Sequence, residues 1–146
     1  MIDQVTQTKF IRLKLIHDGP DGSLLIGENY KEIPFEIKRI YSIMRLGNPL
    51  AVRGKHAHKT LETVITCLNG SFELLLDDGT RNTSVFMDDP SRSVYMGPRL
   101  WHVMRGFSKH CIILFFASDR HKASDYIRDY GKFQNHIKKH TALQRA

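Results

Sequence analysis

Four residues in two stretches of the 146-residue chain could do chemistry together. His56 and His58 lie two apart, Glu62 follows them, and His102 comes after a Gly97-Pro98 turn. In an extended chain, residues two apart share a face, so His56, His58 and, if the strand continues, Glu62 can project into one barrel interior. His102 could reach the same point from a neighbouring strand. Imidazoles shuttle protons near neutral pH, and a cluster of neutral imidazoles can also bind a transition metal.

The histidines need strands to position them, and the sequence predicts antiparallel β structure over residues 8–117. Short apolar runs alternate with turn signals about every 8–12 residues, which is typical of a sandwich or barrel. Asn69-Gly70 and Asp78-Gly79 tolerate positive φ, so we expect two tight hairpin turns and a three-stranded meander around them. The expected strands are Lys9–Leu15, Ser23–Gly27, Ile37–Met44, Thr63–Leu68, Phe72–Leu76, Thr83–Phe86, Ser93–Met96, Val103–Gly106 and Cys111–Ala117.

The pattern changes towards the C-terminus, where it becomes helical. Apolar residues recur at spacings of four, three and four, at Tyr126, Tyr130, Phe133 and Ile137. Ser124 stands where an N-cap would be, so we expect one amphipathic helix over Asp125–His140, packed on the outside of the barrel. The predicted fold is a single all-β domain over residues 1–146, with a barrel at about 8–117 and a C-terminal helix at about 125–140.

Composition and charge exclude several classes of protein. The chain has 22 Lys+Arg against 15 Asp+Glu, a net charge of +7. These residues form no stripe and accompany no nucleic-acid motif, so we expect no nucleic-acid partner, although a small anion needs only two or three positive groups. No apolar stretch reaches the roughly 18 residues of a membrane span, and Met1–Phe10 has no secretory character, so we expect a cytoplasmic protein. Cys67 and Cys111 lie in apolar runs and are expected to be buried thiols.

The spacing of the candidate residues resembles that of a known superfamily. The His-x-His-x3-Glu pattern followed by a Gly, with a downstream Gly-Pro turn and His, is similar to the two motifs of the cupins, whose fold is a double-stranded β-helix or jelly roll. A closer resemblance, to the sugar-nucleotide 3,4-ketoisomerases, covers nearly the whole chain. It is carried by the blocks Asp21-Gly22-Ser23-Leu24, Ile33-Pro34-Phe35-Glu36-Ile37-Lys38-Arg39-Ile40-Tyr41, Arg53-Gly54-x-His56-Ala57-His58, Cys67-Leu68-Asn69-Gly70-Ser71, Leu76-Asp77-Asp78-Gly79, Tyr95-x-Gly97-Pro98-x-x-Trp101-His102, Ala117-Ser118-Asp119 and Asp125-Tyr126-Ile127-Arg128-Asp129-Tyr130.

This resemblance implies an isomerase that moves the carbonyl of dTDP-4-dehydro-6-deoxy-D-glucose from C4 to C3 in deoxyamino-sugar biosynthesis. The C4 ketone acidifies the C3 proton, and an enediolate spanning both carbons collapses to the 3-ketone when C4 is protonated. This requires no redox cofactor, only a base, an acid and hydrogen-bond donors to the enediolate oxygens. We expect His56 and His58 to be the acid–base pair, with Tyr41 as a hydroxyl donor or proton relay; which histidine takes the C3 proton stays open.

Substrate-binding roles follow from the same resemblance. Arg39 and Tyr41 lie two apart and should share a face at the barrel mouth. Arg53 is expected to bind the diphosphate, whose oxygens suit a guanidinium fork. Tyr95 and Trp101 could contact the sugar or stack on thymine. For Arg39, Tyr95 and Trp101, a purely structural role is the alternative.

Metal binding is the second open question. His56, His58, Glu62 and His102 match the ligand set of metal-dependent cupins, whereas the resemblance to the ketoisomerases implies catalysis without a metal. We expect no metal and no cofactor. His102 then shapes the substrate pocket, and Glu62 orients a histidine or pairs with a basic residue.

Two other functions are compatible with these residues. A cupin sugar-nucleotide 3,5-epimerase would also abstract a proton beside the C4 ketone, using a His–Asp dyad and a Tyr acid. A non-catalytic sugar-binding cupin would bind the ligand without turnover. The resemblance further implies a homodimer, and Lys9–Leu15 is the strand that we expect to be exchanged between subunits. The configuration of the product at C4 stays open.

Overall fold

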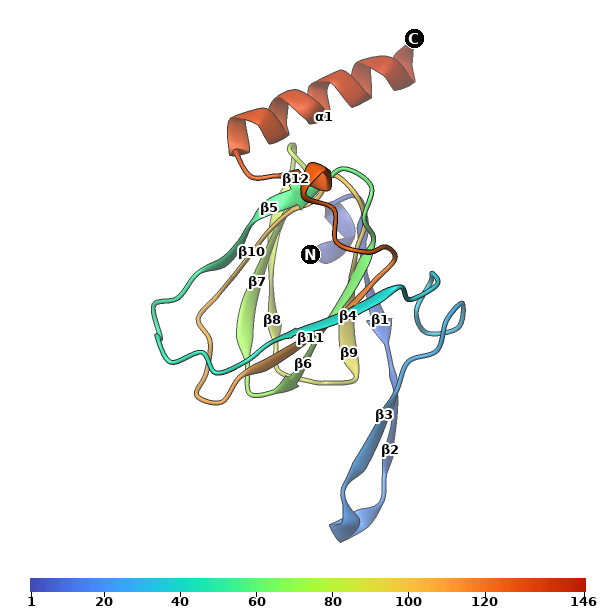
Figure 1. The fold of residues 1–146 in the computed structure, drawn as a ribbon, viewed down its shortest axis with the longest axis vertical. Helices are drawn as coiled ribbons and strands as arrows, with labels where there is room; N and C mark the ends of the chain where they lie inside the picture. Colours follow the sequence, from blue (N-terminus) through green and yellow to red (C-terminus); the bar gives the residue numbers. More distant parts are fainter.

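Two five-stranded antiparallel sheets face each other in the computed structural model, which describes all of residues 1–146 (Figure 1). The first sheet has the order β1 (Thr8–Arg12), β9 (Arg92–Met96), β6 (Thr63–Asn69), β11 (Ile112–Ala117) and β4 (Arg39–Ile43). The second has the order β12 (Tyr126–Ile127), β5 (Arg53–His58), β10 (Trp101–Arg105), β7 (Phe72–Asp77) and β8 (Asn82–Met87).

Three further features lie outside the barrel. A hairpin of β2 (Lys14–His17) and β3 (Ser23–Ile26) projects from one side. The helix α1 (Tyr130–Arg145) crosses one end (Figure 1). Single 3-10 turns occur at Ile2–Gln4, Gly19–Asp21 and Ala123–Asp125. None of the helices combines the length and apolar character that crossing a membrane requires.

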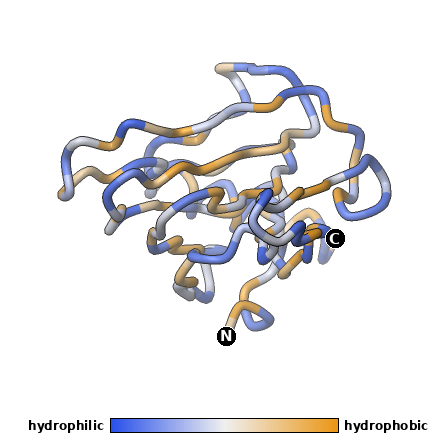
Figure 2. The backbone as a smooth tube through the Cα atoms, turned by 90° about the horizontal axis from the view of Figure 1, so that it is seen from below, coloured by the Kyte–Doolittle hydropathy of each residue, from blue (hydrophilic) through white to orange (hydrophobic).

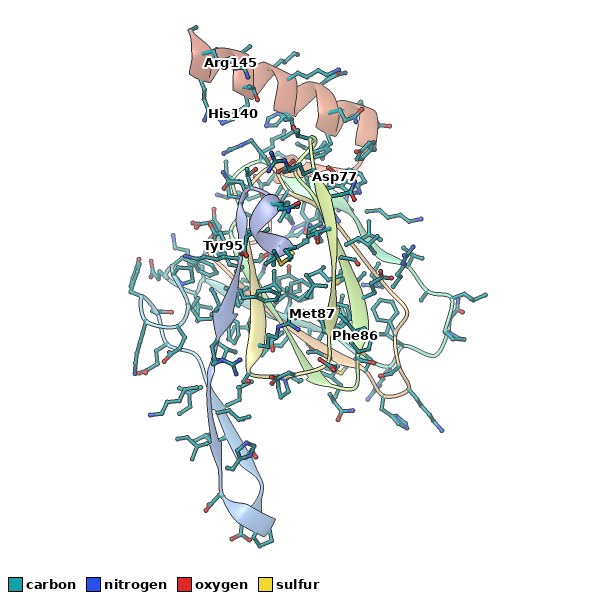
Figure 3. The ribbon with its side chains drawn as sticks, turned by 180° about the vertical axis from the view of Figure 1, so that it is seen from behind. Asp77, Phe86, Met87, Tyr95, His140 and Arg145 are labelled. Carbon is teal, nitrogen blue, oxygen red and sulfur yellow. The ribbon has the colours of Figure 1, made fainter.

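The barrel core is built by the alternation of side chains along the strands. In β7, Phe72, Leu74 and Leu76 are fully buried, while the residues between them are partly exposed. In β8, Met87 is buried between the sheets and its neighbour Phe86 is exposed, as Figure 3 shows. The same mixture of apolar and polar residues runs along the strands in Figure 2. The prediction of an all-β barrel with a C-terminal helix is confirmed.

The expected strand Lys9–Leu15 is two strands in the structure. β1 pairs with β9 inside the barrel, and β2 pairs only with β3. Between them Leu13 is buried and donates its N–H to the carbonyl of Ser91, which holds the chain against the barrel while its direction changes. The other expected strands are present with shifted ends; the run Ile37–Met44, for example, is paired only over Arg39–Ile43.

The expected meander is wrong. Asp78-Gly79 does turn β7 into its partner β8, but Asn69-Gly70 carries the chain from β6 in the first sheet to β7 in the second. Gly70 has a φ of +73°, so the local turn signal was correct. A turn signal reports backbone conformation and not which strand comes to lie alongside.

The helix begins later than expected. Asp129, not Ser124, caps α1 by accepting a hydrogen bond from the N–H of Lys132. Tyr126 lies before the helix, in β12, which pairs with β5. The helix sits over the barrel end through Phe133, which is fully buried against Ala57 and Ile127.

We expect Phe133→Ala to lower the free energy of unfolding by about 3–5 kcal/mol, because it opens a cavity at the centre of the helix–barrel contact. Leu143→Ala on the same helix is the matched control, since Leu143 is 77% exposed. It should change stability by less than about 0.5 kcal/mol. Urea unfolding measures both, and equal effects of the two substitutions would show that the helix is not anchored through Phe133.

Candidate active site

Three histidines meet where β5 and β10 pair. His102 lies directly opposite His56 in the strand register. The ring centroids are 4.4 Å apart for His56 and His102, and 4.9 Å apart for His56 and His58. Gly54 allows this approach, because a Cβ there would lie only 2.7 Å from the carbonyl oxygen of His102. The structure thus brings together the three imidazoles that the spacing suggested.

The hydrogen bonds of the rings define their tautomers. The Nδ1 atom of His56 lies 3.0 Å from the carbonyl of Gly54, and that of His102 lies 3.4 Å from the carbonyl of Leu100. The Nδ1 atom of His58 lies 3.2 Å from the carboxylate of Asp125. Carbonyl and ionised carboxylate oxygens only accept hydrogen bonds, so each Nδ1 carries the proton. In the neutral rings, the Nε2 lone pairs are therefore free to accept a proton or bind a metal.

Burial keeps the histidines neutral. It lowers the pKa of His56 and holds that of His102 well below the ordinary value. The pKa of His58 falls to about 4, because burial and the neighbouring His56 outweigh the attraction of Asp125. All three rings are therefore uncharged near pH 7, and each has a lone pair that can accept a proton.

Asp125 fixes the orientation of His58. Its carboxylate accepts hydrogen bonds from the N–H and hydroxyl of Thr60 and from the N–H of Leu61. Although burial raises the pKa of Asp125, these hydrogen bonds lower it below its usual value. Sequence reasoning missed this residue because Ser124 resembled a helix N-cap, which placed Asp125 inside the helix.

Tyr126 is a second residue that sequence reasoning did not place in the site. β12 pairs it with His58, and its ring centroid lies 4.5 Å from that of His58 and 4.9 Å from that of His56. The guanidinium of Arg128 lies 4.2 Å above the Tyr126 ring. A two-residue strand has no periodicity, so the only signal for this contact was the recurrence of Asp125-Tyr126 in the ketoisomerase-like blocks.

His56 and His102 open onto a cavity of about 420 Å³ in the barrel. Tyr41, Arg53, His56, His102, Tyr126 and Arg128 are among its lining residues. Tyr41 stacks on Phe115 with the ring centroids 4.4 Å apart. Burial raises the pKa of Tyr41, so its phenol stays protonated and can donate a hydrogen bond.

Arg39 shares a face with Tyr41, as expected, and its guanidinium lies 4.8 Å from the Tyr41 ring centroid. It also lines a narrow cleft together with His58 and Tyr126. Its Nε is buried and has no hydrogen-bond partner within the protein. Because a buried donor without a partner is unfavourable, this N–H is available to an acceptor on a ligand.

Three sequence candidates line neither the cavity nor the cleft. The Tyr95 ring packs on the outer apolar cluster of the first sheet, and its hydroxyl donates to Glu62 at 2.6 Å. Glu62 therefore neither orients a histidine nor pairs with a basic residue. Trp101 packs against Tyr130 and Phe133 of the helix, on the face of β10 opposite His102.

The site offers three ligands for a transition metal, and not the four that the sequence suggested. The nitrogen atoms of His56, His58 and His102 lie within 4.8 Å of one another. Neutral rings that donate Nδ1–H to an oxygen and present Nε2 are the usual form of metal-bound histidine. Glu62, the expected carboxylate ligand, is engaged by Tyr95 instead.

Comparison with known proteins gives a consistent set of similarities. Residues 6–138 match the family described as WxcM-like, C-terminal (FdtA). A TDP-4-oxo-6-deoxy-alpha-D-glucose-3,4-oxoisomerase from Aneurinibacillus thermoaerophilus is 44% identical over 91% of this chain and 94% of its own. A 3,4-ketoisomerase from Thermoanaerobacterium thermosaccharolyticum, in complex with TDP-4-keto-6-deoxyglucose, superposes with a TM-score of 0.88 at 35% identity, over 92% and 96% of the two chains. One from Helicobacter canadensis gives 0.85 at 40% identity, over 90% and 97%.

Epimerases are more distant. The RmlC epimerase from Mycobacterium tuberculosis is 16% identical, with a TM-score of 0.70 over 84% of this chain and 68% of its own. This likeness shows a shared fold alone. Together with the ketoisomerase matches, it confirms the prediction of a cupin-like jelly roll.

The neutral histidines predict a pH dependence of stability. The pKa of His58 is about 4 in the folded protein and ordinary, near 6.5, in the unfolded chain. Between these values the unfolded chain binds a proton that the folded chain does not, so stability should fall as the pH drops from about 6.5 towards 4. The slope is at most about 1.4 kcal/mol per pH unit for each such histidine. Urea unfolding between about pH 7 and 5 measures it.

His58→Asn should reduce this slope, whereas the matched change at the exposed His110 should not. Asp125 does not account for the effect, since its pKa lies below the range tested. Equal stability of the native protein at about pH 7 and 5 would contradict the assignment of neutral, buried histidines.

Proposed function

This chain belongs to the WxcM-like, C-terminal (FdtA) family, and we propose that it is a 3,4-ketoisomerase acting on dTDP-4-dehydro-6-deoxy-D-glucose. The observation that carries the proposal is the convergence of three neutral histidines with Nε2 free, two of which line one cavity with a protonated tyrosine. The names of the A. thermoaerophilus relative and the T. thermosaccharolyticum complex support this substrate. We further propose that the enzyme acts in dTDP-deoxyamino-sugar biosynthesis and is located in the cytoplasm.

The reaction requires two proton transfers between neighbouring carbons. A base removes the C3 proton, which the C4 ketone acidifies, and the resulting enediolate carries its charge on the oxygen at C4. A proton then moves from the C3 oxygen to the C4 oxygen, and protonation of the C4 carbon leaves the ketone at C3 and a hydroxyl group at C4. Each step is general acid–base catalysis, helped by donors that stabilise the charged oxygen.

We assign His56 and His58 as the acid–base pair. Both are neutral before the reaction, so one can take the C3 proton, and the imidazolium so formed is an acid that can return a proton. Asp125 would stabilise that charge on His58, which it contacts at 3.2 Å. Tyr41 supplies the hydroxyl donor, because its raised pKa keeps the proton in place.

Two arginines are suited to the diphosphate. Arg53 is exposed at the start of β5 and lines the histidine cavity, where a guanidinium can bind phosphate oxygens in a bidentate way. Arg39 offers its unpartnered Nε beside Tyr41, in the cleft that His58 also lines. His102 is buried behind His56 and shapes the pocket. Trp101 contributes indirectly, by packing against α1, and Tyr95 stabilises the outer face of the first sheet.

A 3,5-epimerase is the second candidate because of one specific observation. His58 and Asp125 form a His–Asp dyad, the arrangement expected of an enzyme that epimerises beside the C4 ketone. Both reactions begin with the same proton abstraction. The low identity to the epimerases favours the ketoisomerase.

NMR of the product formed from dTDP-4-dehydro-6-deoxy-D-glucose tests the activity directly. We expect a 3-keto sugar, and the configuration at C4 is read from the same spectrum. His56→Asn and His58→Asn should each lower kcat by about 10²–10⁴, the usual contribution of a general acid or base, while binding of TDP persists. Activity should also survive prior treatment with a chelator.

The control is His110→Asn, which alters an exposed histidine in the loop before β11 and should leave kcat unchanged. In deuterated solvent, label at C3 and C5 with the carbonyl still at C4 would identify an epimerase. Binding of the substrate without any product would identify a non-catalytic cupin. Loss of activity with the chelator, restored by metal, would overturn the metal-free mechanism.

We also propose that the enzyme is a homodimer joined through the β2–β3 hairpin. The hairpin pairs with no other strand of its own chain and projects from the barrel (Figure 1). Leu24 is 58% exposed and Ile16 is 41% exposed on it. A two-stranded hairpin is marginally stable alone, so the surface of a second copy would supply the missing contacts. The exchanged segment is then the hairpin, while β1 stays in its own barrel.

Leu24→Asp should weaken the dimer, because a charge replaces an apolar contact in the interface. Sedimentation measures the association at micromolar concentration. Leu143→Asp, at an exposed site on α1, is the control and should not change it. A native protein that sediments as a monomer, or a dimer insensitive to Leu24→Asp, would refute the proposed interface.

A further inference from the structure

A second cavity, also of about 420 Å³, lies between α1, the N-terminal segment and the β7–β8 turn. It shares no residue with the histidine cavity. Ile137 is the only apolar residue of its lining. Figure 3 shows His140, which lines it, on the side of α1 that faces the barrel. Such a polar cavity suits a hydrophilic ligand and not an apolar one.

The cavity is basic. Arg81 and Arg99 line it, and neither forms an ion pair with a carboxylate. Arg81 uses one N–H on the carbonyl of Gln4, at 3.3 Å, which leaves its other donors free. The side chain of Arg99 makes no hydrogen bond within the protein. Two guanidinium groups with spare donors are the usual partners of a phosphate group.

Asp78, the one carboxylate of the lining, offsets one of the two positive charges but forms no ion pair with either arginine. Its two oxygens already accept hydrogen bonds from the backbone N–H groups of Thr6, Thr80 and Arg81. It is 7% exposed and serves to fix the β7–β8 turn against the N-terminal segment. The guanidinium groups of Arg81 and Arg99 are therefore available to bind an external anion.

The backbone holds two of the lining residues in an uncommon conformation. Gln7 and Arg99 have φ values of +64° and +60°, in the left-handed region. Gln7 accepts a hydrogen bond from the N–H of Gly97 at 2.7 Å, and Arg99 donates its own N–H to the carbonyl of His58 at 2.6 Å. Left-handed residues other than glycine are concentrated at ligand sites, where the surrounding structure maintains them. Here they present both side chains to one cavity.

We propose that this cavity binds a small phosphate-bearing anion between Arg81 and Arg99. Side-chain amides and hydroxyls, which bind oxygen atoms without adding charge, complete the site: Gln4, Gln7, Gln144, Thr6, Thr80 and Thr141. The site is separate from the diphosphate contacts proposed at Arg53 and Arg39. An occupant would lie against the turn that donates a hydrogen bond to His58.

Calorimetric titration with inorganic pyrophosphate tests the site. The titration is made in the Arg39→Gln/Arg53→Gln protein, which removes both of the diphosphate contacts proposed at the first site. We expect saturable binding of one equivalent. Adding Arg99→Gln or Arg81→Gln should weaken it at least tenfold, because each removes a charged hydrogen-bond donor. Arg105→Gln is the matched control, since Arg105 pairs with Glu73 elsewhere and should not alter binding.

Three results would overturn the proposal: no saturable binding, binding that neither Arg99→Gln nor Arg81→Gln weakens, or equal weakening by Arg105→Gln. Thermal unfolding without anion checks that each variant is folded. The titration measures no turnover, so its failure and a failure of the ketoisomerase assay are distinct results.

Discussion

The close pairing of β5 with β10 is the constraint on which the site depends. Only a glycine at position 54 lets the carbonyl of His102 come so near, and this approach brings His56 and His102 face to edge. Packed together between the sheets, the rings lose water and hence charge. Their neutrality is therefore a product of the strand pairing, and the free Nε2 atoms follow from the backbone carbonyls that occupy Nδ1 of His56 and His102.

The other edge of β5 completes the arrangement. There β12 adds only two residues to the sheet, yet it brings Tyr126 beside His58 and leaves Asp125 against the Nδ1 atom of the same ring. The chain then enters α1, whose burial at Phe133 holds β12 in place. The helix thus supports the histidines although none of its own residues lines their cavity.

Periodicity predicted the parts of the site that strands carry. The spacing of two correctly placed His56 with His58 and Arg39 with Tyr41. The same rule could have excluded Trp101, because it directly precedes His102 and must point to the opposite face. Asp125 and Tyr126 were not predicted as site residues, because a two-residue strand shows no alternation. The prediction of a meander was wrong because a glycine turn can connect strands of the same sheet or of different sheets. Pairing between distant strands is decided by packing, which no local pattern records.

The fold shows where part of the net charge of +7 lies in space. Along the chain the arginines are dispersed, which argued against a nucleic-acid surface. In three dimensions, Arg53 and Arg128 line the histidine cavity, and Arg81 and Arg99 line the cavity under α1. In a β-barrel, the residues that line one cavity come from segments far apart in the chain, so the arginines of one cavity are dispersed in the sequence. Arginines that are too dispersed in the sequence to indicate a nucleic-acid surface can therefore still line two cavities suited to small anions.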